Sequence, residues 1–408
     1  MGRAPLASNN NNNNNNTTLI NGWLTIGSRI WRNNMSNKDE SVFSKEALMG
    51  TQAGKEIMKQ GFLRSKGYRQ FNQYKEKTGN EFQGFADRFV MSLHKAIAVD
   101  DNPAGTICKF AEEVNSPELV PAGNVTDIKA RLSSPEALGD RVKRILNSNF
   151  VKMTFPVFNA LFDGATQYFN NSISEERRNA VIDGHIIAID LSEPMDRIVD
   201  KDEDLEYLED YKFMNPYILA IARSKIAQGG DIVLKAFEEG FRDARVGQYI
   251  DVKLKIKPAS ISDENMTECY KKYRAVMGTA GRNMALNRRP LGDIFHLGMA
   301  KAGECVGCGN EIEDAIKNNA VKVPSWPLYF AINTGDVRRG FELTMAKSEL
   351  YLDEAKIALD MLPESFQLKP FLEFLFLTVR HYNQHWYNEL VRRAPFEEFQ
   401  QKIEKLMS

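Results

Sequence analysis

The chain has 408 residues, of which 43% are hydrophobic and 26% charged, and its formal net charge is -1. This composition is typical of a soluble globular protein with a sizeable core, and the balanced charge gives no electrostatic reason to expect a nucleic-acid partner. The longest apolar run, near 374–377, is far shorter than the ~18–20 residues of a transmembrane helix. Only four cysteines occur, which excludes a disulfide scaffold and indicates a reducing compartment, either cytoplasm or plastid.

The chain divides into three parts. Residues 1–16 end in an asparagine run and are typical of a low-complexity linker, so a native targeting segment could be absent. Residues 17–140 are expected to form an N-terminal helical extension, with a turn at 101–105. Residues 141–408 are expected to form one helical domain of catalytic size. Apolar residues recur at helical spacing in the segments 45–60, 81–99, 151–169, 175–189, 215–228, 231–251, 264–281, 291–319, 325–333, 335–361 and 367–393. The sequence therefore predicts an all-α fold of ten or more helices.

Three polar residues in the segment 291–319, Asn310, Asp314 and Asn318, stand four positions apart. On a helix they lie on one face, about 6 Å apart along the axis. Oxygen-bearing side chains at this spacing can hold a hard cation such as Mg²⁺, which shares its ligands with phosphates. Lys317 stands beside them and can meet a phosphate as a point charge. The alternative interpretation is the solvated polar face of an ordinary helix.

A second group of oxygen ligands follows the apolar run 186–189: Asp190 comes first, then Glu193, Asp196 and Asp200. A buried helix that ends in carboxylates places them at the rim of whatever its bundle encloses. The alternative is a charged loop after a helix. Pro194 indicates that the helix is interrupted near this point.

Aromatic residues also recur at near-helical spacing in the segment 151–169, where they fit either a protein core or a ligand pocket. Core packing is the commoner role for most of them. Cys305 and Cys308 have the spacing of a zinc-binding pair, but no second pair completes a site, so we expect them to pack against a neighbouring helix.

In chain order, these features resemble the motifs of class I terpene cyclases. That family has an aspartate-rich motif at the end of one helix, a diphosphate-sensing arginine, an Asn/Ser/Glu metal motif with an adjacent lysine, and a basic residue near its closing helix. The positions that carry the resemblance are Asp190, Tyr270-x-x-x-Arg274, the Asn310, Asp314 and Asn318 set with Lys317, and Trp386 followed by Arg392.

The chain departs from the family pattern at several positions. Leu191 replaces the second aspartate, and the segment 196–200 is an equally tolerable match to the aspartate-rich motif of polyprenyl synthases, so Glu193, Asp196 and Asp200 are alternative ligands. Asp314 and Asn318 replace Ser and Glu. Arg393 stands where the closing tyrosine is usual, and Arg380-His381-Tyr382 is a rival assignment.

The resemblance implies a class I terpene synthase-like bundle in which Asp190, Asn310, Asp314 and Asn318 hold Mg²⁺. It implies catalytic and diphosphate-binding roles for Arg274, Lys317 and Arg392, and a substrate-lining role for Phe158, Phe162 and Trp386. It also implies an apolar wall around a cationic intermediate, for which the candidates are Phe155, Phe158, Phe162, Phe295, Trp326, Tyr329 and Trp386. With its altered metal triad the chain is most similar to the algal N-prenyltransferases of domoic and kainic acid biosynthesis. Those enzymes join geranyl diphosphate to the amino group of L-glutamate and release diphosphate.

Two other functions stay open at this point. The chain could be a mono- or sesquiterpene cyclase with no acceptor, or a non-enzymatic helical scaffold. A transferase would need cations for the acceptor carboxylates, for which Arg223, Arg282, Arg288 and His185 are candidates, and a base for the amine, which the sequence does not identify. We expect a monomer or a homodimer.

Overall fold

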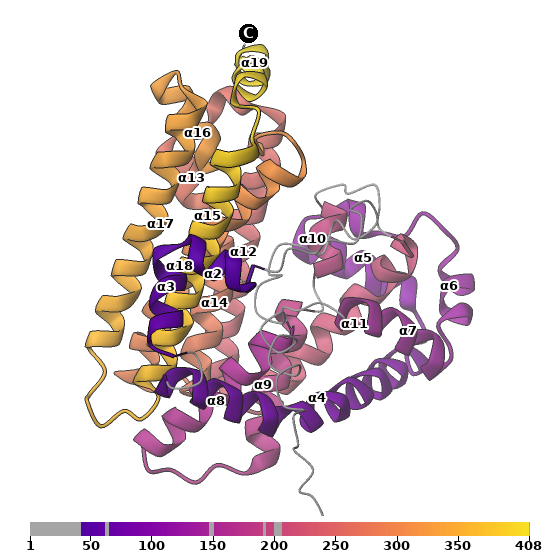
Figure 1. Cartoon of the computed structure of the whole chain (residues 1–408). Coiled ribbons are helices and arrows are strands. Elements are labelled where there is room, and N and C mark those ends of the chain that lie inside the picture. Colours follow the sequence, from indigo (N-terminus) through magenta and orange to yellow (C-terminus); the bar gives the residue numbers. More distant parts are fainter. Residues whose placement is uncertain (1–41, 62–64, 147–150, 191–192, 200–205, 408) are drawn as a thin grey trace, which may run out of the picture.

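The protein is described by a computed structural model that covers residues 42–61, 65–146, 151–190, 193–199 and 206–407. Helices, and no strands, make up the regular structure of these ranges (Figure 1), which confirms the all-α prediction. The linker expected at 1–16 lies outside them. None of the helices found there combines the length and apolar character that crossing a bilayer requires.

The first group of helices occupies the segment that was expected to be an N-terminal extension. Their first residues are well explained by side-chain caps, because Ser44, Thr51, Ser65, Asn102 and Asn124 each accept a hydrogen bond from a backbone N–H of the following turn. The group consists of α2 (Lys45–Gly50), α3 (Gln52–Lys59), α4 (Lys66–Ala98), α5 (Pro103–Val114), η2 (Pro117–Leu119), α6 (Val125–Arg131) and α7 (Pro135–Leu146).

The second group contains every segment that the sequence assigned to the catalytic-sized domain. It consists of α8 (Val151–Tyr168), α9 (Glu175–Asp190), α10 (Glu193–Val199), α11 (Leu208–Ala227), α12 (Asp231–Ile256), η3 (Pro258–Ser260), α13 (Asp263–Cys269), α14 (Lys271–Met284), α15 (Leu291–Lys317), α16 (Trp326–Thr334), α17 (Val337–Asp360), α18 (Lys369–Arg393) and α19 (Phe396–Met407). Pro194 lies in the first turn of α10, where a proline is tolerated.

In space the helices form two connected sides, whose members do not follow the order of the chain (Figure 1). α12 to α19 make an elongated bundle, while α5, α6, α7, α10 and α11 form the other side of the molecule. α4 runs across the base and packs on α18 and α8 as well as on α7 and α11, and α9 packs on α8, α11 and α14. The base of the molecule therefore joins its two sides.

α9 and α15, which carry predicted metal ligands, are largely buried. In α9 the eight consecutive residues 180–187 are buried, and in α15 eighteen of the 27 residues are buried. A helix that is buried all round lies inside its bundle. Gly309 allows α18 to approach α15 closely, because a methyl group at this position would lie 2.1 Å from Asn383 Oδ1. The predicted ligands Asp190 and Asn310 thus lie on central helices.

The N-terminal helices are tied to α18, which comes more than 300 positions later in the chain. His381 Nδ1 lies 2.7 Å from Thr51 Oγ1, and His381 Nε2 lies 2.8 Å from the carbonyl oxygen of Val42. The backbone N–H of Ala53 donates to Gln384 Oε1 at 3.1 Å. These bonds are buried or partly buried, so residues 42–59 form part of the bundle surface around α18.

Candidate functional site

Asn310, Asp314 and Asn318, here called the polar stripe, lie at the end of α15, and two of the three share one partly exposed face. Asn310 and Asp314 are half-buried and one turn apart, and the Asp314 side chain is 20% exposed. Asn318 is the C-cap residue, is exposed, and donates its backbone N–H to the Asp314 carbonyl at 2.8 Å. The stripe therefore offers an amide and a carboxylate from the helix, with a second amide at its end.

Beneath this face lies a buried carboxylate that the sequence did not single out. Glu313 has no exposed surface, accepts a hydrogen bond from the Tyr382 hydroxyl, and pairs with Lys317. Burial raises the pKa of the Glu313 carboxyl, while Lys317 and Tyr382 act in the opposite direction. Tyr382 Oη also lies 3.1 Å from Asn310 Oδ1. One phenol therefore links Glu313 to a predicted metal ligand.

Lys317 and Trp386, both predicted site residues, lie together at the same place. The Lys317 ammonium is 5.5 Å from the centroid of the Trp386 ring, within the range of a cation–π contact. The Trp386 and Tyr382 rings meet edge to face with centroids 6.4 Å apart. α15 supplies the charged groups of this cluster and α18 supplies its aromatic groups.

Asp190 lies at the end of α9 and is 3% exposed. Its Oδ2 accepts a hydrogen bond of 2.9 Å from Thr154 Oγ1 on α8. Phe158 and Phe162 follow Thr154 at four-residue intervals, so all three share one face of α8, and both phenylalanines are buried in the core. The first predicted ligand thus lies at the polar end of an aromatic stripe.

The alternative acidic ligands follow α9 in the chain. Glu193 lies in α10, where its carboxylate is 4.0 Å from Arg197 one turn later. Asp196 belongs to the same helix, and Asp200 lies outside the described residues.

Arg274 belongs to α14 and contacts a different face of α15. Its Nε and Nη2 donate to Glu304 Oε1 at 2.9 and 2.6 Å, and Glu304 has no exposed surface and also pairs with Lys301 at 3.0 Å. Glu304 precedes Asn310 by six positions, about 9 Å along a helix axis and roughly a third of a turn away around it. Arg274 is therefore paired with the buried Glu304 carboxylate, and this pair lies apart from the face of α15 that carries Asn310.

Arg392 lies in the last turn of α18 and pairs with Glu389 on the same helix. Its side chain is 60% exposed. It follows Trp386 by six positions, about 9 Å along the axis. Arg392 is thus a surface cation beyond the Lys317 and Trp386 pair.

The cations considered for acceptor carboxylates are engaged elsewhere. Arg223 pairs with Glu238 at 2.8 Å, Arg282 pairs with Asp293 at 3.1 Å, and Arg288 lies 5.1 Å from the Phe169 ring centroid. His185 is buried and hydrogen-bonded to Asn283, and burial lowers its pKa to about 3. A histidine that is neutral at physiological pH attracts no carboxylate by charge.

A second buried acid lies on the opposite side of α15. Glu311 is hydrogen-bonded to the Tyr270 side chain, and its Oε2 accepts from the Trp326 backbone N–H at 3.1 Å. Burial raises the pKa of Glu311 to about 8. Trp326 and Tyr270 pack edge to face at 5.6 Å, which places Trp326 in the core.

The cysteine pair is a packing feature. Cys305 and Cys308 are buried free thiols, and their sulfur atoms face different partners, Asn383 Nδ2 at 3.2 Å and Tyr270 Oη at 3.7 Å. Within the described ranges no group of three or more His, Cys, Asp or Glu side chains converges as metal ligands would.

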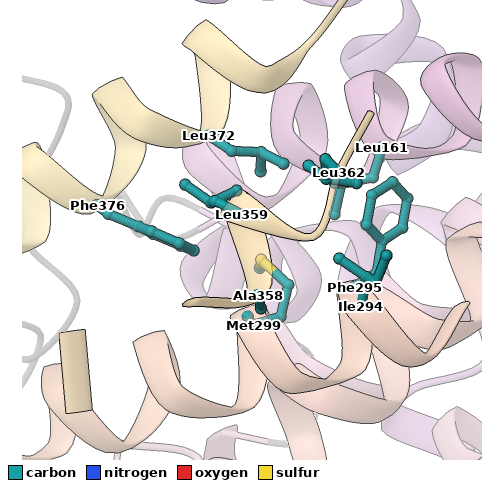
Figure 2. A pocket seen from close by; sticks show the side chains of 10 residues that line it. Leu161, Ile294, Phe295, Met299, Ala358, Leu359, Leu362, Leu372 and Phe376 are labelled. Atoms are coloured by element: carbon teal, nitrogen blue, oxygen red, sulfur yellow. The ribbon is translucent and has the colours of Figure 1, made fainter. Parts of the chain in front are cut away.

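An apolar pocket lies near the start of α15 (Figure 2). Side chains from α8, α15, α17, α18 and the connection after α17 line it, and none of them carries a charge or a hydrogen-bonding group: Leu161, Ile294, Phe295, Met299, Ala358, Leu359, Leu362, Leu372 and Phe376, with Gly298. Met299 precedes Asn310 by eleven positions, about 16 Å along the helix. This pocket has no group that could hold a diphosphate.

Comparison of the chain with protein-family models, with curated proteins and with solved structures finds no match.

Proposed function

We propose that the chain is a Mg²⁺-dependent prenyltransferase that joins geranyl diphosphate to the amino group of L-glutamate and releases diphosphate, in the biosynthesis of a kainoid natural product of the domoic acid type. The observation that carries the proposal is the cluster at the end of α15. There, two half-buried oxygen ligands stand beside a lysine that rests on the face of Trp386. The order of motifs along the chain supports the same reaction class.

The side chains at this place suit a magnesium ion. Mg²⁺ binds hard oxygen ligands, often through only one or two carboxylates, and takes its remaining ligands from water and substrate phosphates. Asn310 and Asp314 offer one amide and one carboxylate, and Asp190 is a further candidate from α9. When bound, the ion would neutralise the charge that builds on a departing diphosphate.

Several of the predicted site residues then have a definable role. Lys317 would contact a diphosphate oxygen as a point charge, while its pair with Glu313 keeps it near the Asn310 face. The half-buried Trp386 side chain would stabilise an allylic cation through its π-face. Phe158 and Phe162 would continue an apolar lining below Asp190, although both also pack in the core. The acceptor amine must arrive without its ammonium proton, because the nitrogen lone pair forms the new C–N bond.

A terpene cyclase is the second candidate, and one observation favours it. Arg223 and Arg282 are paired with carboxylates of the chain itself, and His185 is held neutral. A cyclase needs no cations for an amino acid acceptor, and the same metal cluster would serve it.

The test is incubation of the purified chain with geranyl diphosphate, Mg²⁺ and L-glutamate, followed by mass spectrometry and measurement of released diphosphate. N-geranyl-L-glutamate is the expected product. Cyclic or linear terpene alone would reject the transferase in favour of the cyclase. No diphosphate release with this or a longer prenyl diphosphate, and no thermal stabilisation by Mg²⁺ with inorganic diphosphate, would leave the scaffold interpretation.

A further inference from the structure

Glu313 is enclosed between α15 and α18, and its position in the sequence is significant. It follows Asn310 by three residues and precedes Lys317 by four, so it lies within one turn of both predicted site residues. A buried carboxylate costs free energy unless it is hydrogen-bonded or paired. Glu313 satisfies this requirement with the Tyr382 hydroxyl on one side and the Lys317 ammonium on the other.

The Tyr382 hydroxyl stands between this carboxylate and Asn310. A phenol has a single proton, and the carboxylate is the stronger acceptor for it. Because that proton is donated in the hydrogen bond to Glu313, the phenol oxygen can act only as an acceptor toward Asn310, 3.1 Å away. The oxygen and nitrogen of an amide are interchangeable by shape, so the favoured orientation has the Asn310 amide N–H donating to Tyr382 Oη. The amide oxygen then turns away from Tyr382, toward the partly exposed face.

We propose that Glu313 and Tyr382 are positioning residues that orient the two chemical groups at the end of α15. Tyr382 fixes the Asn310 amide so that its oxygen can bind a cation, and Glu313 fixes both Tyr382 and Lys317. This inference rests on the proposed function, because it gives these residues a role in holding Mg²⁺ and diphosphate. Outer partners of metal ligands set ligand orientation, and their loss typically weakens metal binding about 10- to 100-fold.

The experiment uses Tyr382→Phe, which removes one oxygen and keeps the ring between α15 and α18. Thermal shift is measured against Mg²⁺ concentration in the presence of saturating inorganic diphosphate. We expect the Mg²⁺ concentration at half-maximal shift to rise about 10- to 100-fold. The matched control is Tyr217→Phe, which removes a hydroxyl from a partly buried tyrosine–carboxylate pair, 2.7 Å from Asp100 Oδ2. It should lower the thermal midpoint without changing the Mg²⁺ dependence by more than about twofold.

The outcomes separate the inference from the proposed function. If the wild-type chain gives no Mg²⁺- and diphosphate-dependent shift, the proposed function fails. If the wild type responds and Tyr382→Phe responds at the same Mg²⁺ concentration, the positioning role is wrong while the metal site stands. Should Tyr382→Phe fold poorly, Glu313→Gln keeps the shape and the acceptor for Tyr382 while removing the charge that holds Lys317. A wild-type Mg²⁺ dependence in that variant would equally overturn the role of Glu313.

Discussion

Gly298, at the apolar pocket of Figure 2, offers a quantitative test of how α15 is packed. A methyl group added there would lie 3.6 Å from both Ala358 Cβ and Phe376 Cζ, which is ordinary van der Waals contact. Alanine is favoured over glycine inside a helix by about 0.8–1.0 kcal/mol, and burying one methyl group contributes about 0.8 kcal/mol. Gly298→Ala should therefore stabilise the chain by about 1.5–2 kcal/mol.

The matched control on the same helix is Gly303. A methyl group there would lie 2.8 Å from the Tyr273 carbonyl oxygen and 3.1 Å from two carbons of Met277. Both substitutions gain the same helix propensity. The difference in stability between the two variants therefore reports how much space each added methyl group finds. Forcing an extra group into a packed contact costs about 1–3 kcal/mol, and Gly303→Ala should be neutral or destabilising.

Differential scanning calorimetry measures the difference. Unfolding entropy is about 2.1 cal/mol/K per residue, so a chain of this size changes its midpoint by roughly 1 °C for each 0.8 kcal/mol. Gly298→Ala should raise the thermal midpoint by about 2 °C, and Gly303→Ala should not raise it. A lower midpoint for Gly298→Ala, or equal increases for both variants, would refute this account of the packing around α15.

Three further predictions concern buried and site residues. Replacing both Asn310 and Asp314 by alanine should reduce turnover of a prenyl diphosphate on the order of 10²-fold or more, with the helical circular dichroism and thermal midpoint preserved; a wild-type rate would remove the metal assignment. Because burial raises the pKa of Glu311 to about 8 from its ordinary value of 4.5, the folded chain keeps a proton that the unfolded chain loses. The free energy of unfolding should therefore fall by about 1.4 kcal/mol per pH unit between these values, and urea titrations of Glu311→Gln should lack this part of the slope. Asp210 is 2% exposed and accepts from Arg141 at 2.8 Å, so Asp210→Ala should lower the urea-derived stability by about 3 kcal/mol or more; a loss below about 1 kcal/mol would contradict a buried pair.

Most helices of the second half were predictable from apolar periodicity, because they have one face that must be buried, whereas α10 and α19 were not among the predicted segments. The prediction that the whole segment 101–105 forms a turn was wrong, because α5 begins at Pro103. Asn102 is in fact the N-cap of α5, with its side chain accepting from the Gly105 N–H at 3.1 Å, and Pro103 occupies the first helical position. Asparagine followed by proline suits both a turn and a helix start, and only the residues after Gly105 separate the two.

The partners of polar residues were harder to predict than the helices. Glu304, Glu311 and Glu313 are all buried although the sequence places them among ordinary polar positions of one helix. Each is satisfied by a residue outside α15, namely Arg274 on α14, Tyr270 between α13 and α14, and Tyr382 on α18. Local periodicity contains no information about such distant partners. The spacing of Glu313 four positions before Lys317 was the one local sign of a pair.

The attachment of residues 42–59 to α18 has a practical consequence for work on this chain. Tyr382 is the immediate neighbour of His381, the residue that joins Thr51 and Val42 to α18. A shortened gene that starts after position 60 would strip the cover from this helix and leave His381 without both bonds. Loss of Mg²⁺ response in such a truncated protein would report damage to α18, so enzymology should be done on chains that begin before residue 42.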